Sequence, residues 1–544
     1  MRYLSENKRG DMRMKKRTAA RSMAALMGAA MVLTACGGGN TTAPTTGASS
    51  GGETQTASES AESGKITKTD IVVGQASDIV TLDPAGQQDT TSGVLMKHAY
   101  STLLDVDNEG EVVPDLAESY EMKSDTEYVF KLREDACFWD GTPVTAQDVK
   151  FSLDRAKGMP KTKSNTSKIE EVTVNGDHEV TIKLTEPYAA FKTIVTQHNL
   201  SILSEKAVTE AGDSYGDVDN LLGSGPFKVT EWVPNDHYTL VRNDNYWGEM
   251  PIATSITCRV IPEGSARTIA LEAGEIDVVW SVDPTDCANV ESNPDVKLLS
   301  QPSTGIDYVG MNTQKEKFSD KRVRQAINYA LDKQTFVDTI IEGRGLVANS
   351  YINAAIPGWT DEVEAYPYDP EKAKELLAEA GYPDGFECSI FVNGDLRTRS
   401  AQILQAQLAD VGIKVDISTY EWGALLDTLN AGEHEMFLLG WSNTSFDPDG
   451  STYQLFYSGN HGATGNRAFF SNDKVDELIL SAQRESEESK RMELYKELQF
   501  VLHDESPWCP LYYKENNVGV RADLKGFTLH AGAQHYLGNC HYEE

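Results

Sequence analysis

The sequence predicts a mixed α/β protein, on three observations. Short segments with period-two alternation, typical of strands, recur along the chain, and segments with apolar residues at helical spacing stand between them. From Ile66 onward neither low-complexity sequence nor an internal repeat interrupts this alternation. The chain has 544 residues, 40% of them hydrophobic and 24% charged, so it is long enough for about three domains or two large ones.

The strands are predicted from β-branched and aromatic residues at alternate positions, bounded by turn residues. Gly223-Ser224-Gly225 is read as a tight turn into one of them, because Pro226 removes the free amide row that a phosphate loop needs. The predicted strands are Ile71–Gly74, Glu127–Leu132, Phe227–Thr230, Lys414–Ser418, Asn517–Val520 and Gly526–Leu529.

The helices are predicted from apolar stripes and from their end signals. Thr145 is a good N-cap with Asp148 three residues on, and Val149 and Leu153 follow at helical spacing. A second helix begins near Ser319 and presents one apolar face. The remaining predicted helices are Glu371–Ala380, Thr398–Asp410, Val475–Arg484 and Arg491–His503.

Charge is distributed unevenly along the chain, whose formal net charge is −34. Residues 1–35 contain eight Lys or Arg and two acids, whereas residues 36–544 contain 41 bases and 81 acids, a net charge of −40. A body this acidic repels nucleic acid and anionic lipid surfaces, so a DNA- or RNA-binding role is excluded.

The N-terminus has the order of an export signal. A basic cluster precedes the apolar run Met23–Thr34, which is too short to span a membrane. Leu33-Thr34-Ala35-Cys36 resembles a bacterial lipobox, which implies removal of residues 1–35 and lipidation of Cys36; a plain signal peptide with an incidental cysteine is the alternative. Residues 36–66, rich in Gly, Ser and Thr, are predicted to be a flexible tether from the membrane to the folded body.

Metal and disulfide signals are weak. Six cysteines follow Cys36 without any paired spacing, so they form up to three disulfides or remain buried thiols. Asp105–Gly110 is read as a hairpin turn, because Leu116 stands where a calcium loop needs a bidentate Glu. The C-terminal His530, His535, Cys540 and His541 fit no ligand spacing and are expected in an exposed tail.

Catalytic signals are missing as well. The chain has no HExxH, GxSxG, P-loop or dinucleotide fingerprint in a suitable context, and no acid/base pair can be singled out. We therefore predict a protein that is not an enzyme and that needs neither a cofactor nor a metal.

Several longer segments resemble the extracytoplasmic solute-binding proteins that serve peptide and nickel ABC importers, often called family 5. The resemblance is found in order along residues 66–544. The matching segments are PDLAESYE (114–121), YVFKLREDACFWDGTPVTAQDVKFSL (128–153), GSGPFKVTEW (223–232), RNDNYWG (242–248), YVGMNT (308–313), KRVRQAINYALDK (321–333), GWSNTSFDPD (440–449) and residues 472–478.

The resemblance implies a two-lobed α/β fold of the periplasmic-binding-protein type II, with mixed sheets and a ligand cleft between the lobes. Lobe I would comprise residues 67–308 plus 515–544, and lobe II residues 309–514, with chain crossings near 307–310 and 513–517. Ligands favour such a cleft because closure buries most of their surface.

The resemblance also implies candidate ligand-binding residues. Dipeptide-binding relatives hold the ligand ammonium with an acid after the Gly-Trp pair, where this chain has the neutral Thr444. Asp447 is the next candidate, with a turn or helix-cap role as its alternative. Arg397, with Arg399 nearby, would take a ligand carboxylate, and Trp441 would supply a flat wall or core packing. Thr91 and Gly225 are added as residues of the lobe I side.

The predicted function is a membrane-anchored receptor, on the extracytoplasmic face of a Gram-positive-type cell, that delivers short peptides or peptide-like solutes to an ABC permease and acts as a monomer. A nickel- or metallophore-binding receptor of the same family is an alternative, although no histidine cluster lies near Trp441. A surface adhesion or signalling protein is another. A secreted hydrolase is the least favoured reading, because no nucleophile–base arrangement can be assembled.

Overall fold

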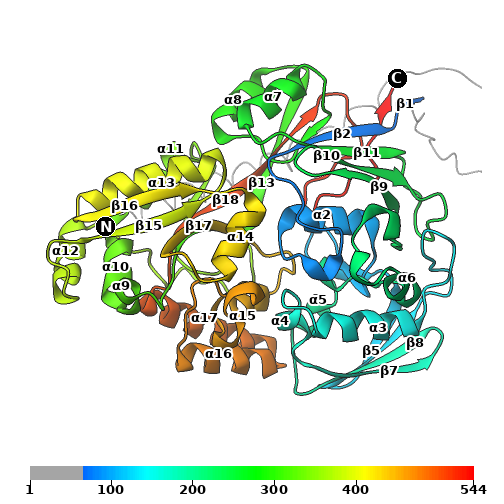
Figure 1. The fold of residues 1–544 in the computed structure, drawn as a ribbon, viewed down its shortest axis with the longest axis horizontal. Coiled ribbons are helices and arrows are strands. Elements are labelled where there is room, and N and C mark those ends of the chain that lie inside the picture. Colours follow the sequence, from blue (N-terminus) through cyan, green and yellow to red (C-terminus); the bar gives the residue numbers. More distant parts are fainter. Residues whose placement is uncertain (1–64) are drawn as a thin grey trace, which may run out of the picture. The chain divides into compact units, whose positions relative to one another are not determined.

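The computed structural model describes residues 65–544, which form two α/β lobes (Figure 1). The predicted signal peptide, Cys36 and most of the predicted tether lie outside these residues. The tether prediction ran to residue 66, but β1 begins at Ile66, because its backbone pairs with β19 at the C-terminus. The limits 67–308 plus 515–544 for lobe I and 309–514 for lobe II remain our proposal for the extents of the lobes.

The largest sheet within residues 65–544 has 11 strands in the order β16-β15-β17-β13-β18-β12-β2-β11-β10-β9, with β14 paired to β18. Its centre is the antiparallel pair of β13 (Val296–Met311) and β18 (Trp508–Arg521), which run side by side between the two halves of the sheet. The other strands of this sheet are β2 (Asp70–Gln75), β9 (Phe227–Val233), β10 (His237–Arg242), β11 (Ser255–Val260), β12 (Val278–Val279), β14 (Gly345–Val347), β15 (Phe386–Val392), β16 (Ile413–Thr419) and β17 (Met436–Ser442).

A second, antiparallel sheet lies in the N-terminal part, in the order β5-β6-β8-β7, and α3 packs on it (Figure 1). Its inward residues, among them Phe130 and Ile182, are completely buried with the apolar face of α3. The remaining strands are β1 (Ile66–Lys68), β3 (Leu104–Val106), β4 (Val112–Pro114), β5 (Ala117–Ser124), β6 (Glu127–Leu132), β7 (Ile169–Gly176), β8 (Glu179–Leu184) and β19 (Tyr542–Glu543).

Helices cover both lobes. They are α2 (Thr90–Ala99), α3 (Ala146–Lys157), α4 (Lys163–Thr166), α5 (Phe191–Ile194), α6 (Glu205–Ala211), α7 (Gly264–Glu272), α8 (Cys287–Ser292), α9 (Glu316–Ser319), α10 (Lys321–Ala330), α11 (Lys333–Thr339), α12 (Pro370–Glu379), α13 (Gly394–Ala409), α14 (Trp422–Asn430), α15 (Asp449–Phe456), α16 (Asp473–Arg484) and α17 (Glu488–Glu505), with short 3-10 turns between them.

The predicted helix starts are confirmed where a capping side chain marks them. Thr145 and Asp148 form a capping box at α3, and Asp320 caps α10. The prediction that a helix begins at Thr398 is wrong by four residues. There the hydroxyl of Thr398 donates to the carbonyl of Gly394, inside the first turn of α13. This earlier start places Arg397 within that turn.

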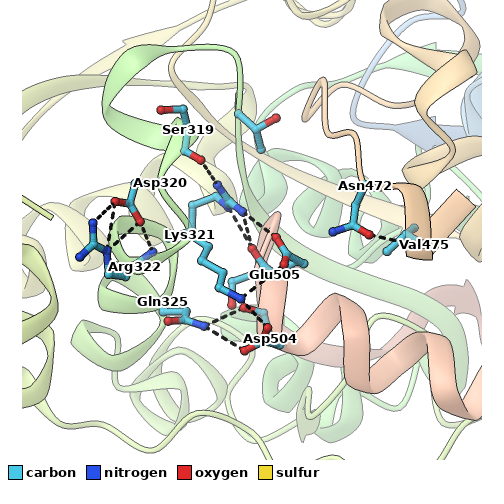
Figure 2. A network of polar contacts seen from close by, with 12 residues as sticks. Ser319, Asp320, Lys321, Arg322, Gln325, Asn472, Val475, Asp504 and Glu505 are labelled. Atoms are coloured by element: carbon cyan, nitrogen blue, oxygen red, sulfur yellow. Dashed lines mark hydrogen bonds and ion pairs between the residues drawn. The ribbon is translucent and has the colours of Figure 1, made fainter.

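Polar contacts join α10 to the end of α17 in lobe II (Figure 2). Lys321 Nζ lies 2.6 Å from Asp504 Oδ2, and Gln325 donates to the Asp504 carbonyl at 2.7 Å. The buried Arg324 donates to the carbonyl of Glu505 as well. The carbonyls in the last turn of α17 thus accept hydrogen bonds from side chains of α10, which fixes the chain just before it enters β18.

The prediction of an exposed C-terminal tail is wrong. His530, His535 and Cys540 are 2%, 3% and 0% exposed, because the chain returns to lobe I and packs there. The Leu537 amide donates to His98 Nε2 at 3.0 Å, and β19 pairs with β1. The predicted strand Gly526–Leu529 is also wrong, since the structure has only an isolated bridge between Lys525 and His541 in this region.

The structure shows the state of the cysteines and the predicted hairpin. The six cysteines from Cys137 onward are free thiols, and five of them are buried. Asp107 accepts hydrogen bonds from the amides of Glu109 and Glu111 at the turn between β3 and β4, so the predicted hairpin is confirmed.

Among residues 65–544, no group of three or more His, Cys, Asp or Glu is arranged to hold a metal. The same residues include no helix that is both long and apolar enough to cross a bilayer.

Burial of histidines makes stability depend on pH. Burial lowers the pKa of His98, His434 and His530 to about 4, and that of His535 to about 3. Since unfolded histidines titrate near ~6.5, the unfolded chain takes up protons in the window from about 6.5 down to about 4 that the folded chain does not. We expect the free energy of unfolding to fall with falling pH in that window, by up to about 1.4 kcal/mol per pH unit for each histidine.

Buried carboxyls act in the opposite direction, because burial raises the pKa of Asp89, that of Asp115 to about 7 and that of Asp449 to about 6. The histidines outnumber them, so the net slope keeps its sign. Urea unfolding between about pH 7.5 and about pH 5 measures the slope. His434→Gln should make it shallower. His237→Gln should not, because the hydrogen bond that the His237 ring donates to Glu231 raises the pKa of this half-buried histidine. A slope that is flat or of the opposite sign would contradict the assignment.

Candidate functional site

A cavity of about 400 Å³ lies where the two lobes meet. Lobe I contributes the first turn of α2, Gln197, Trp280 and the 533–535 segment, while lobe II contributes the start of α13, the start of α14 and the end of β17. α2 and α14 face each other in the middle of Figure 1, and both line this cavity. The neighbouring strands β13 and β18 form its floor through Tyr308 and residues 514–517.

Contacts between the lobes flank the cavity. Thr444 Oγ1 donates to Gln197 Oε1 at 3.0 Å, and the Tyr188 hydroxyl donates to Asp449 Oδ2 at 2.6 Å. On another side, Arg399 donates to Asp283 at 2.7 Å. These contacts join the two lobes beside the cavity.

The structure brings four of the six predicted site residues to the cavity wall: Trp441, Thr444, Arg397 and Thr91. Trp441 meets both of its interpretations, because it packs against the lobe II core and also lines the cavity, while its indole nitrogen donates to the Gly450 carbonyl at 3.0 Å. Thr91 lies in the first turn of α2, which Asp89 caps through the Ser92 amide.

Asp447 lies outside the cavity wall. Its carboxylate is buried and accepts two hydrogen bonds from the guanidinium of Arg491, at 2.9 and 2.5 Å, and one from the Asp449 amide at 2.9 Å. The turn-and-cap role that the sequence left open for Asp447 therefore accounts for its contacts, and both of its oxygens are already engaged by the protein.

Gly225 also lies outside the cavity wall, in a close backbone crossing. A Cβ at this position would lie 2.6 Å from the backbone carbonyl carbon of Ala99 and 2.6 Å from the amide of Tyr100. The Gly225 amide donates to the Ala99 carbonyl at 3.0 Å, so the two segments are in direct contact. Glycine is required here for packing.

We expect Gly225→Ala to lower the free energy of unfolding by about 2–3 kcal/mol, because backbone atoms cannot move aside for the methyl group. Gly423→Ala is the matched control, since the nearest atom to its Cβ is Glu421 Oε2 at 3.5 Å, at the end of a flexible side chain. Urea unfolding of both variants measures the difference. An equal, small effect at both positions would contradict the close crossing.

Sequence reasoning missed Arg467, Asp89 and Trp422, which also line the cavity. Asp89 caps α2, the helix that carries Thr91, and burial raises the pKa of its carboxyl. Arg467 had no local signal, because it reaches the cavity from an irregular segment that is held by tertiary contacts to Asn430 and His434.

A two-lobed α/β fold with a cavity at the lobe boundary defines a ligand-binding protein of the periplasmic-binding-protein class. Residues 111–463 match the family model described as bacterial extracellular solute-binding proteins, family 5 Middle. The chain belongs to this family.

Relatives and solved structures agree with this assignment. The dipeptide-binding protein of Escherichia coli strain K12 is 30% identical over 80% of this chain and 86% of its own length. The glutathione-binding protein of Shigella boydii is 31% identical over 85% of this chain and 92% of its own length. An ABC transporter-associated periplasmic binding protein of Helicobacter pylori, solved with the peptide STSA, is 28% identical with a TM-score of 0.84, covering 88% of this chain and 99% of that one.

Proposed function

We propose that this protein is the receptor of an ABC importer that captures short peptides or peptide-like solutes outside the cytoplasm and delivers them to the permease. The observation that carries the proposal is the cavity of about 400 Å³ between the lobes, which polar and apolar side chains line together. Its volume suits a small solute. The names of its relatives add the ligand class, since they include dipeptide- and glutathione-binding proteins.

The wall offers the groups that a peptide backbone needs. Amide side chains can both donate to and accept from peptide groups, and the wall includes Gln88, Gln197, Asn393, Asn516 and Gln534. Trp280, Trp422 and Trp441 supply flat apolar surfaces for side chains. Such a wall binds through main-chain and water-mediated contacts, which tolerate different side chains.

The proposed carboxylate partner is Arg397 rather than Arg399. Arg397 lines the cavity, whereas Arg399 is paired with Asp283. The proposed cycle contains no bond-breaking step: the lobes close on the solute, the closed form docks on the permease, and reopening releases the solute.

Membrane anchoring belongs to the same proposal. We propose that residues 1–35 are removed, that Cys36 is lipidated, and that the tether holds a monomeric receptor on the outer face of the cell membrane. The support is the order of basic cluster, apolar run and Leu33-Thr34-Ala35-Cys36. Mass spectrometry of the cellular protein tests it: a diacylglyceryl mass on Cys36 is expected, and an unmodified Cys36 would refute it.

Thermal unfolding of residues 37–544 with a library of di- to pentapeptides tests the receptor function. A ligand that binds only the folded state must raise the melting temperature, and the stabilisation grows with the logarithm of its concentration over its dissociation constant. We expect several peptides to do so. A response to nickel chelates, with none to any peptide, would replace the peptide assignment by the metallophore alternative.

A further inference from the structure

Two arginines in the cavity wall have no counter-ion among residues 65–544. Arg397 on α13 and Arg467, in the segment before α16, both line the cavity. Within residues 65–544 neither of them forms an ion pair. The cavity's other two cationic side chains in this range, Arg344 and Lys514, contact carboxylates at 2.6 and 2.9 Å. The two cations without an ion pair, Arg397 and Arg467, both lie on the lobe II side of the cavity.

Arg467 is the more buried of the two, at 6% exposed. Its Nε donates to Asn430 Oδ1 at 3.0 Å, and its own carbonyl is hydrogen-bonded by the His434 ring at 2.8 Å, so the residue is held in place. Across the described chain no acceptor hydrogen-bonds its two terminal nitrogens. A guanidinium withdrawn from water without an anion is unfavourable, and an anionic group in the cavity would compensate this cost.

The Arg397 side chain is likewise held in place by neighbours that do not balance its charge. Its Nη1 donates to Asn393 Oδ1 at 2.7 Å, and its guanidinium lies 5.9 Å from the centre of the Trp422 ring. Its Nε is buried and has no hydrogen-bond partner among the described residues. Neutral amide and aromatic neighbours orient the side chain but leave its charge available to a ligand.

The two guanidiniums act on the same part of the cavity. Both arginines line the same cavity as Tyr308, where burial raises the pKa of the Tyr308 hydroxyl and their positive charges oppose this rise. Asp89 is the acid that acts on Arg467, but it forms no ion pair with it, and burial raises the pKa of the Asp89 carboxyl. This corner of the cavity is therefore positive, inside a protein whose net charge is −34.

We propose that the site selects solutes with two negatively charged groups, one bound by Arg397 and the second by Arg467. The proposal rests on the proposed receptor function and narrows it: the preferred peptide has an acidic side chain in addition to its terminal carboxylate. A bidentate guanidinium–carboxylate contact is directional, so Arg467 discriminates between a carboxylate and an amide of the same shape.

Isothermal titration with the dipeptides Ala-Glu and Ala-Gln tests the proposal, because the two ligands differ in one charge and hardly in shape. For the wild-type protein we expect Ala-Glu to bind at least about tenfold more tightly. In Arg467→Gln the ratio of the two dissociation constants should fall to about one, with Ala-Gln affinity unchanged. Arg344→Gln, which removes a paired arginine of the same cavity, should retain the ratio.

The outcomes separate the proposal from the function on which it rests. Equal affinities in the wild type, or a ratio that survives in Arg467→Gln with native circular dichroism, would overturn the second anion site. If neither dipeptide binds, titration with glutarate decides. Glutarate binding that requires Arg467 would support the anion site and refute peptide capture. If glutarate does not bind either, both the anion site and peptide capture are refuted.

Discussion

Replacing Asp447 by alanine is expected to lower the free energy of unfolding by about 3–5 kcal/mol. The carboxylate and the guanidinium of Arg491 are 11% and 9% exposed and form a two-bond contact at 2.5 and 2.9 Å. Removing the acid leaves a buried guanidinium without its anion and frees the Asp449 amide at the start of α15. Urea unfolding followed by circular dichroism measures the loss.

The Arg242–Asp244 pair provides a matched comparison, since it joins the same residue types at 3.0 Å with Asp244 81% exposed. Asp244→Ala should therefore cost below about 1 kcal/mol. Because Asp447 lies outside the cavity wall, peptide affinity of the folded Asp447→Ala protein should stay within about twofold of wild type. An affinity loss without a loss of stability would assign Asp447 to the ligand instead.

Arg397→Gln is expected to weaken peptide binding by about 10- to 100-fold, the second large effect. Glutamine retains hydrogen bonding but loses the charge and the planar fork that hold a carboxylate. The loss corresponds to about 1.5–3 kcal/mol, typical for a hydrogen bond to a charged group. Isothermal titration with a peptide and with its C-terminal amide measures it, and the amide should lose little.

Arg399→Gln is the control for position on the helix. Arg399 lies two residues further along α13, is paired with Asp283 in lobe I, and does not line the cavity. Its variant loses a contact between the lobes but keeps the carboxylate partner, so discrimination between the acid and the amide should survive. If Arg399→Gln, and not Arg397→Gln, abolishes that discrimination, the carboxylate partner has been assigned to the wrong residue.

Local sequence was sufficient for most of the elements of the fold. The Thr145–Asp148 capping box and the alternating Glu127–Leu132 are determined by neighbouring residues, and both appear as predicted. Predictions failed where distant residues decide the outcome. The C-terminal histidines looked like a solvated tail, but the Leu537 amide between them donates to His98 and β19 pairs with β1, and both partners are more than 400 residues away in the chain.

The predictions for the candidate site likewise succeeded for some residues and failed for others. Trp441 and Arg397 could be placed from motifs because each lies near the end of a strand or the start of a helix, where the order of elements determines position. Asp447 and Gly225 come from equally clear motifs, yet their atoms are taken up by Arg491 and by the backbone at Ala99. Motif membership did not distinguish a ligand-facing residue from a packed one.

The amino-acid sequence alone predicted the mixed α/β class and the family, because these depend on periodicity and on long motifs. The tertiary structure was needed to show which charges are left without partners. An arginine becomes a binding group only when no protein carboxylate reaches it. For Arg467, Arg397 and Asp447 that depends on side chains brought together from distant parts of the chain.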